Sequence, residues 1–249
     1  MENKVICIAN GKGGEGKTTC GVNLATTLRL LGFDVVYYDA DEQGNGSDWI
    51  DRALSRDEDS PIWPNTAAPG GVKIKNEIQT LQRAYDFVIV DTPGTLIGES
   101  LSLINQAIAV SDLVLIPLKP TLMDIATTQN FCHVVQNIQN LFDGKPPAYL
   151  WINQVHNRAG TRTERALIAD AESEDAMMGY SVLKSRSFYC EAMANMFGSG
   201  ACVHDCDDMD YVRRHKAKQT KDFFNLAKEL AEILGVELEA TAAELVAEA

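Results

Sequence analysis

Short, continuous apolar runs alternate along the chain with longer segments in which apolar residues recur every three or four positions. The runs are rich in β-branched residues and cover Val5–Ala9, Val35–Tyr38, Phe87–Val90, Leu113–Ile116 and Tyr149–Ile152. Such runs are typical of strands that are buried on both faces of a sheet. The periodic segments predict helices over Thr18–Leu31, Ile74–Arg83, Leu101–Val110 and Leu122–Leu141. This alternation predicts a doubly wound α/β fold, with a mostly parallel sheet and helices on both faces.

The length of 249 residues suits one large domain, and we expect residues 1–249 to form it. The segment Ser60–Gly71 holds three prolines and two glycines and predicts a loop rather than a domain boundary. Residues 236–249 are expected to form an acidic C-terminal tail. The apolar runs are far shorter than the ~20 residues that span a bilayer, and no charged-then-apolar leader stands at the start. We therefore expect a cytoplasmic protein.

The net charge is −13, from 22 Lys and Arg against 35 Asp and Glu. This balance argues against a protein that contacts nucleic acid over most of its surface, because DNA affinity depends on neutralising phosphates. The charge is segregated, however, and residues 210–221 carry five basic residues and a single acidic one. The five are Arg213, Arg214, Lys216, Lys218 and Lys221. They predict a local basic surface, for which a solvated helix face is the alternative interpretation.

A glycine- and lysine-rich segment joins the first expected strand to the first expected helix. Its residues are Gly11, Lys12, Gly13, Gly14, Glu15, Gly16, Lys17, Thr18 and Thr19. Glycines let the backbone wind so that successive N–H groups point at phosphate oxygens, and the helix N-terminus adds positive potential. In this context the pattern predicts a phosphate-binding loop. We expect Lys17 to hold the β- and γ-phosphates, the Thr18 hydroxyl to bind Mg²⁺, and Thr19 to reach the α-phosphate.

Carboxylates follow two of the other expected strands. Asp91 ends the run Phe87–Val90, which is the pattern of a Walker B strand whose carboxylate binds Mg²⁺, usually through water. Gly94 comes shortly after it and can bring its backbone N–H to the γ-phosphate, as switch segments of GTPases do. Asp39 and Asp41 follow the second strand. Because phosphoryl transfer needs a metal and a positioned water more than covalent chemistry, these residues predict a nucleotide-hydrolysing site.

Lys12 does not belong to the plain phosphate-loop pattern and resembles the signature lysine of the deviant Walker A motif in the ParA/MinD family of P-loop NTPases. In that family this lysine crosses to the partner subunit's nucleotide, so the resemblance implies an ATP-dependent homodimer. The segment from Asp39 to Asn45 is similar to the family's D-x-D-P-Q-G-N sequence, with Glu42 in place of the proline. The resemblance implies that Asp41 orients the attacking water and that Asp39 supports the Mg²⁺ shell. Lys12, Lys17 and Asp41 are thus the expected catalytic residues.

The same resemblance implies that Asn153, after the fifth strand, reads the edge of adenine, although asparagine is also a common turn residue. The similarity is specific over residues 4–48 and 85–124 and diffuse after about residue 155. The run from Asp91 to Asp124 is similar to small plasmid-partition ParA proteins and to VirC-type ATPases. The expected cofactors are ATP and Mg²⁺.

Branches of the family differ in their partners. A nitrogenase-type iron–sulfur cluster is excluded because no cysteine lies between residues 94 and 102. The acidic C-terminal end argues against a membrane-binding helix of the MinD kind. The basic segment 210–221 falls where ParA proteins bind non-specific double-stranded DNA, and Arg186 is a second candidate contact.

The resemblance therefore implies a nucleoid-associated ATPase for DNA segregation and plasmid partition. Its ATP-bound dimer binds DNA and releases it after hydrolysis, which is slow until a ParB-like adaptor stimulates it. One alternative is a VirC-like ATPase that positions a protein assembly or a DNA-transfer complex. A metabolic ATP-dependent synthetase of the same fold is a second alternative, which Lys12 disfavours because such relatives generally lack it.

Overall fold

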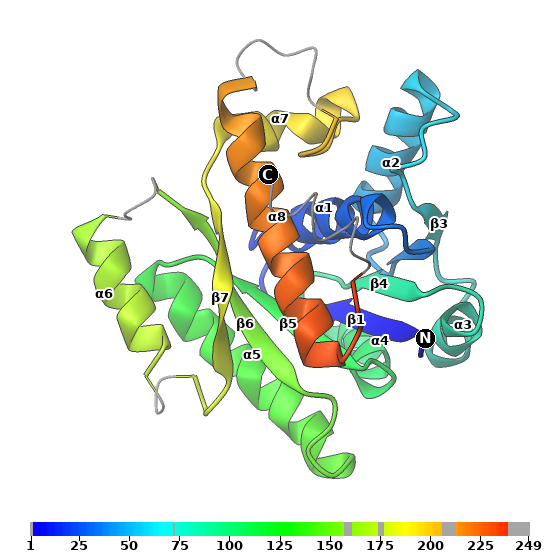
Figure 1. Ribbon diagram of the computed structural model, residues 1–249. Helices are drawn as coiled ribbons and strands as arrows, with labels where there is room; N and C mark the ends of the chain where they lie inside the picture. The colour runs from blue at the N-terminus through cyan, green and yellow to red at the C-terminus, as the bar shows by residue number, and fades with distance from the viewer. Residues whose placement is uncertain (1, 72, 157–160, 174–176, 206–212, 239–249) are drawn as a thin grey trace.

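The structure, a computed structural model, describes residues 2–71, 73–156, 161–173, 177–205 and 213–238 (Figure 1). Within these residues, seven strands form one sheet in which all paired neighbours run parallel. The strand order is β3-β2-β4-β1-β5-β6-β7. The strands are β1 (Lys4–Ile8), β2 (Val35–Asp39), β3 (Asn65–Ala67), β4 (Phe87–Asp91), β5 (Leu113–Leu118), β6 (Ala148–Val155) and β7 (Ser181–Phe188).

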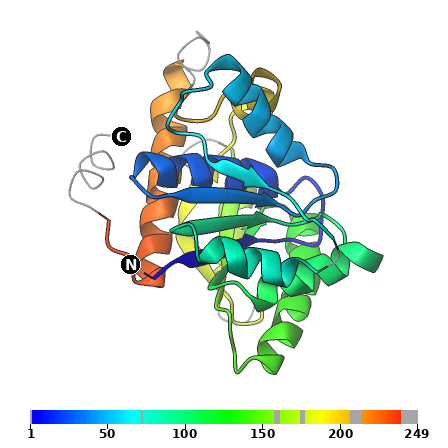
Figure 2. The ribbon, with the colours of Figure 1, turned by 90° about the vertical axis from the view of Figure 1, so that its right-hand side faces the viewer.

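Helices cover both faces of this sheet (Figure 2). One side carries α1 (Lys17–Leu30), α2 (Asn45–Arg56), α7 (Glu191–Ser199) and α8 (Arg213–Leu234). The other side carries α3 (Ile74–Gln82), α4 (Gly98–Ala109), α5 (Leu122–Leu141) and α6 (Arg162–Ala171). The predicted doubly wound α/β fold with a parallel sheet is confirmed. None of the described helices combines the length and the apolar character that a membrane span requires.

The central strands are apolar at most positions, and each face of the sheet has its own core. On β1, Ile6 and Ile8 point into the layer beneath α1 and α8, whereas Val5 and Cys7 point into the layer beneath α4 and α5. All four are buried. Burial of both faces is what the continuous apolar runs predict.

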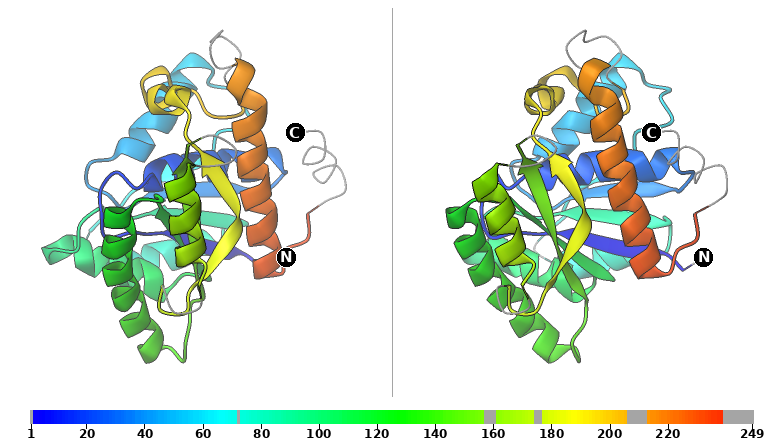
Figure 3. Two further views of the ribbon diagram at one scale, coloured as in Figure 1. Left: turned by 90° about the vertical axis from the view of Figure 1, so that its left-hand side faces the viewer. Right: turned by 60° about the vertical axis from the view of Figure 1, so that its left-hand side comes forward.

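The apolar pattern missed helices α2, α6 and α7 and both edge strands of the sheet, β3 and β7. β3 lies inside Ser60–Gly71, so the prediction of a loop is wrong for Asn65–Ala67. This strand has only three residues, and two of them are exposed. β7 alternates between buried and more exposed positions and is covered by α8 (Figure 3). Glu229 of α8 accepts hydrogen bonds from the backbone N–H groups of Lys184 and Ser185 at 2.7 and 2.8 Å.

The order of the strands reverses beside β1. The chain leaves β1 toward β2 on one side and later crosses from β4 to β5 on the other. In open α/β sheets such a switch point, at the carboxyl ends of the strands, is where ligands bind. The loops after β1, β2 and β4 meet at this edge, and they carry most of the candidate site residues.

Candidate functional site

The loop between β1 and α1 is built on glycines in the left-handed region. Gly14 and Gly16 have φ angles of 81° and 87°, which cost glycine little and a side-chain-bearing residue much more. Gly16 is the N-cap of α1, and no side chain caps this helix. Free backbone N–H groups and the helix dipole make such an N-terminus a site for anions.

Lys17 opens α1 and is buried, with its Nζ donating a hydrogen bond to the carbonyl oxygen of Lys12 at 3.1 Å. Burial lowers the pKa of Lys17, while nearby carboxylates oppose that shift. The loop after β4 closes against the same place. A Cβ at Gly94 would lie 3.0 Å from the Cα of Gly13 and 3.2 Å from the Lys17 Nζ, so a side chain here would crowd the phosphate loop. The predicted grouping of Lys17, Gly13 and Gly94 is therefore present.

Asp91, at the end of β4, is buried and tied to two hydroxyl groups. Its Oδ2 accepts hydrogen bonds from Thr18 Oγ1 and from the Tyr37 hydroxyl, each at 2.7 Å. Its Oδ1 is also buried and has no hydrogen-bond partner among the described residues. Burial raises the pKa of Asp91 to about 6, against the two hydrogen bonds, which lower it. A buried carboxylate oxygen without a partner, beside a threonine hydroxyl, suits a hard cation such as Mg²⁺.

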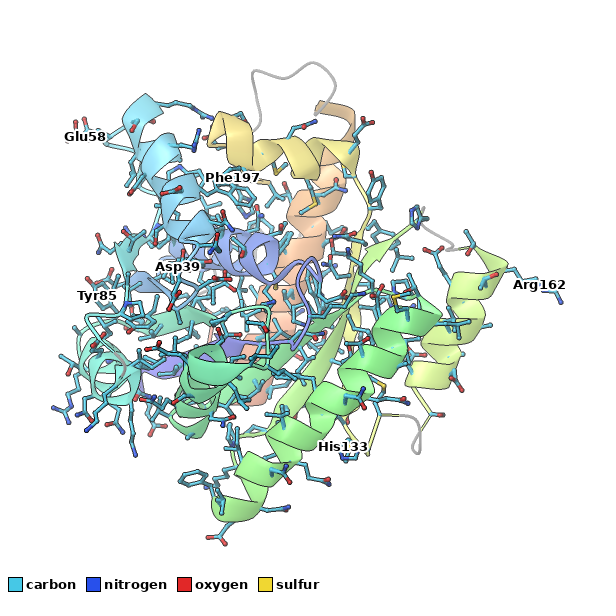
Figure 4. All side chains as sticks on the ribbon, turned by 180° about the vertical axis from the view of Figure 1, so that it is seen from behind. Asp39, Glu58, Tyr85, His133, Arg162 and Phe197 are labelled. Carbon is cyan, nitrogen blue, oxygen red and sulfur yellow. The ribbon has the colours of Figure 1, made fainter. Side chains whose placement is uncertain are left out.

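Asp39 ends β2 directly beside Asp91, because the register of the two strands pairs these residues. It is buried among side chains and loops on the α1 and α2 side of the sheet (Figure 4). Its two oxygens accept hydrogen bonds from the backbone N–H groups of Asp41 (3.3 Å) and Ser47 (2.9 Å). Burial raises the pKa of Asp39, and these hydrogen bonds oppose the shift. The two strand-end carboxylates thus lie together, as the sequence predicts.

Asp41 is partly exposed in the turn that leads from β2 to α2. Its Oδ1 accepts a hydrogen bond from the backbone N–H of Gln43 at 3.1 Å, and its carbonyl accepts one from Gly44 at 2.9 Å. Asp41 and Asp39 line a cavity of about 630 Å³ that extends to the loop after β3. Glu42, which stands in place of the family's proline, is exposed in the same turn. The backbone turn therefore closes without that proline.

Lys12 has partners that the sequence did not reveal. Its Nζ forms an ion pair with Asp124, in the first turn of α5, and lies 3.6 Å from Glu15 Oε1. Glu15 is buried inside the loop, where its Oε2 accepts a hydrogen bond from the Lys119 backbone N–H at 3.2 Å. Burial raises the pKa of Asp124, but hydrogen bonds from Lys12 and the N-cap Thr121 outweigh it and hold that pKa below its ordinary value. Lys12 is thus paired within its own subunit.

The capping pattern Thr121-x-x-Asp124 is a visible signal for a helix start. It identifies Asp124 as a residue near the helix N-terminus but does not reveal its pairing with Lys12. No comparable signal identifies the hydroxyl of Tyr37 as a partner of Asp91, because the sequence shows Tyr37 only as one residue of an apolar run.

Asn153 lies against the phosphate loop, inside β6 and two residues before the strand ends at Val155. Its Nδ2 donates a hydrogen bond to the carbonyl oxygen of Glu15 at 2.9 Å. A Cβ on Gly16 would lie 2.1 Å from that same nitrogen, so the close approach depends on the glycine. Asn153 and Thr19 also line a small cavity of about 80 Å³ with Phe188. The structure therefore brings Asn153 to the site.

The candidate DNA contacts are separate from this cluster. α8 begins at Arg213, and the side chains of Arg213, Arg214, Lys216 and Lys218 lie outside the described part of the structure. Lys221, on the following turn, is exposed. Arg186 lies on β7 and is paired with Glu172. The DNA-binding assignments remain predictions.

Residues 6–196 match the family described as the CobQ/CobB/MinD/ParA nucleotide binding domain. Maintenance of carboxysome distribution protein A from Gloeobacter kilaueensis is 31% identical over 137 residues, which cover 52% of this chain and 56% of that protein. Chromosome partitioning protein ParA from Myxococcus xanthus is 29% identical over 153 residues, covering 47% of this chain and 52% of that protein. The matches span less than two thirds of the length of the first curated relatives.

Solved structures share the fold. An ATP complex of McdA from Cyanothece superposes with a TM-score of 0.70 at 17% identity, covering 96% of this chain and 99% of that one. MinD from Pyrococcus horikoshii, in complex with Mg-ADP, gives a TM-score of 0.66 at 19% identity, covering 94% and 98%. The family match over residues 6–196 includes the phosphate loop and the strand ends that carry Asp39, Asp91 and Asn153. The chain therefore belongs to the CobQ/CobB/MinD/ParA family of nucleotide-binding domains.

Proposed function

We propose that this protein is a ParA-type ATPase for DNA segregation, formed by residues 1–249 as one domain, with ATP and Mg²⁺ as cofactors. The observation that carries the proposal is the meeting of three features at one edge of the sheet. These are a phosphate loop that contains Lys12, a buried oxygen of Asp91 that has no partner within the described part of the chain, and Asp39 directly alongside. ATPases are characteristic of the ParA/MinD branch of the family.

In this proposal, residues 11–19 bind the triphosphate through backbone N–H groups and the N-terminus of α1. The ammonium group of Lys17 neutralises phosphate charge from within the loop, and Gly94 approaches the γ-phosphate from the loop after β4. Asn153 lies at the adenine end, where the cavity that it shares with Thr19 opens. Each of these residues already lies at the phosphate loop.

Thr18, Asp39 and Asp91 would hold Mg²⁺, directly or through water, since all three present oxygen ligands. When bound, the cation would neutralise charge on the phosphate oxygens as the γ-phosphoryl group is transferred to water. Asp41 accepts a hydrogen bond from the attacking water and orients it toward the γ-phosphate. Its position in an open turn, at the wall of the large cavity, leaves room for that water.

The partners follow from Lys12 and from the basic residues. Lys12 leaves Asp124 and reaches the nucleotide of a second copy, so that ATP joins two subunits. The dimer binds non-specific double-stranded DNA through Arg186 and the basic residues of segment 210–221, which associates it with the nucleoid. A ParB-like adaptor stimulates the otherwise slow hydrolysis and so releases the DNA, and no membrane takes part.

A second candidate function is the positioning of a protein assembly. The relationship to McdA in both sequence and fold favours it. It uses the same ATPase cycle with a protein cargo in place of a plasmid or chromosome region.

The proposal is tested by binding to random-sequence duplex DNA with ATP, with ADP and without nucleotide, at two salt concentrations. We expect binding that requires ATP and weakens with salt, because phosphate contacts release counterions. Identifying the cargo to which the adaptor binds, a DNA region or a protein assembly, then separates DNA partition from protein positioning. Absence of DNA binding in every state would overturn the DNA-segregation function.

A further inference from the structure

Tyr37 occupies a slot that two helices leave open for it. It lies in the middle of β2, is buried, and points to the side of the sheet covered by α1 and α2. A Cβ at Gly21 of α1 would lie 2.9 Å from the ring Cε2, and a Cβ at Gly46 of α2 would lie 2.1 Å from the hydroxyl oxygen. Both glycines therefore make room for the ring and its hydroxyl.

The hydroxyl reaches the carboxylate at the end of the neighbouring strand. Tyr37 pairs in register with Ile89, and Asp91 lies two residues further along on the same face. The 2.7 Å hydrogen bond from Tyr37 and the equal one from Thr18 both end on Oδ2. The other oxygen, Oδ1, is buried and without a partner among the described residues. The two donors thus fix which oxygen of Asp91 remains available.

The two hydroxyl groups that donate to Asp91, those of Thr18 and Tyr37, differ in their other roles. In the proposed function, on which this inference rests, the Thr18 hydroxyl also binds the metal, whereas the hydrogen bond described for the Tyr37 hydroxyl goes to the carboxylate. The terminal torsion of an aspartate is broad and roughly two-fold, so a single shared donor holds its plane weakly. The hydrogen bond from Tyr37 is the second restraint on the plane of the Asp91 carboxylate.

We propose that Tyr37 is a positioning residue for the metal site, whose hydroxyl holds Oδ2 of Asp91 so that Oδ1 faces the Mg²⁺ shell. A phenylalanine would fill the same slot and bury nearly the same apolar area, so packing alone does not require the oxygen. If Tyr37 has this role, removing its hydroxyl oxygen should weaken Mg²⁺ binding and leave metal-free nucleotide binding unchanged.

The chain offers a matched control in the next residue. Tyr38 lies on the same strand but points to the opposite side, where its hydroxyl donates a hydrogen bond to Glu77 Oε2 at 2.7 Å. Tyr37→Phe and Tyr38→Phe each delete one oxygen from a buried tyrosine that donates to a carboxylate. Only the first of the two carboxylates belongs to the proposed metal site.

The experiment follows binding of a fluorescent ATP analogue while Mg²⁺ is titrated, and repeats the binding in EDTA. For Tyr37→Phe we expect the half-saturating Mg²⁺ concentration to rise about tenfold, in line with the loss of one hydrogen bond to a charged group. Its affinity for nucleotide in EDTA and the Mg²⁺ titration of Tyr38→Phe should match those of the wild type. A Tyr37→Phe titration that coincides with that of Tyr38→Phe would overturn the inference.

A second variant covers the case in which Tyr37→Phe does not fold. Gly46→Ala keeps the hydroxyl but displaces it, since the new methyl group would lie within 2.1 Å of that oxygen. It should raise the half-saturating Mg²⁺ concentration as well, and an unchanged value would overturn the inference. Wild-type protein that binds nucleotide without any Mg²⁺ dependence would instead overturn the proposed function itself.

Discussion

The ion pair between Lys12 and Asp124 opposes the proposed dimer, because Lys12 cannot hold Asp124 and reach a partner's nucleotide at once. Asp124→Asn tests this competition. Asparagine keeps an oxygen that can accept the hydrogen bond from the Thr121 hydroxyl but loses the charge that holds Lys12. If the pair restrains Lys12, the variant should dimerise more readily with ATP.

The exposure of the two side chains sets the size of the effect. Exposed ion pairs contribute about 0–1 kcal/mol, whereas breaking a buried pair costs about 3–5 kcal/mol. Lys12 is 33% exposed and Asp124 is 8% exposed, which places this pair between the two classes, at about 1–2 kcal/mol. A symmetric dimer breaks this ion pair in both subunits, so the two pairs together oppose dimerisation by about 2–4 kcal/mol. The dimer dissociation constant should therefore fall about 30- to 700-fold.

Sedimentation equilibrium with ATP and Mg²⁺ measures this constant directly. The Asp124→Asn variant and the protein with which it is compared should both carry Asp41→Ala, which removes the proposed water-orienting carboxylate and should trap the ATP dimer. Glu99→Gln is the control, because it removes the same charge from the first turn of the neighbouring helix α4. An Asp124→Asn variant that dimerises no more tightly than the Glu99→Gln control would refute the competition.

Three further predictions concern other parts of the molecule. Lys17→Ala should abolish ATP binding measured by calorimetry, and tight binding in this variant contradicts the phosphate-loop assignment. Arg213→Ala with Arg214→Ala should weaken duplex DNA binding and reduce its salt dependence by up to about two counterions, while the ATP dimer persists; an identical salt titration would move the DNA surface elsewhere. Burial raises the pKa of Glu164, but backbone and His156 hydrogen bonds outweigh it and hold that pKa at about 2, below ~4.3 in an unfolded chain. The lowered pKa stabilises the fold above about pH 4.3, and this stabilisation is lost as the pH falls toward 2. Glu164→Gln should therefore unfold more easily at neutral pH but lose less stability on acidification, and parallel pH profiles for the two proteins exclude this role.

The fold was predictable where burial is symmetric. β1, β2, β4, β5 and β6 were all foreseen from continuous apolar runs, since both faces of these strands are covered. β3 and β7 lie at the edges of the sheet, and neither gives such a run. A pattern based on two-sided burial cannot find a strand that buries one side or has only three residues.

The candidate site divides into residues that a local motif identifies and contacts between residues far apart in the sequence. Residues that are contiguous in sequence, such as the loop from Gly11 to Thr19, were visible as a motif. The strand-end carboxylates Asp39 and Asp91 were visible because parallel strands bring their carboxyl ends together. The contact of Tyr37 with Asp91 depends instead on strand register, and that of Lys12 with Asp124 on how α5 docks. Such contacts join residues 54 and 112 positions apart, which a local pattern does not relate.

The contacts of Tyr37 with Asp91 and of Lys12 with Asp124 both involve carboxylates, so both affect the charge around the phosphate loop. Of the residues that the structure describes, five carboxylates gather around the phosphate loop, those of Glu15, Asp39, Asp41, Asp91 and Asp124. The loop itself supplies two lysines, and one of them is held by Asp124. A triphosphate that enters this edge without a cation therefore meets an excess of negative charge, with the N-terminus of α1 and Lys17 as its main attraction. In the proposed function, Mg²⁺ between the carboxylates and the phosphates would reverse that balance, so we expect the orientation of Asp91 to affect nucleotide affinity as well as hydrolysis.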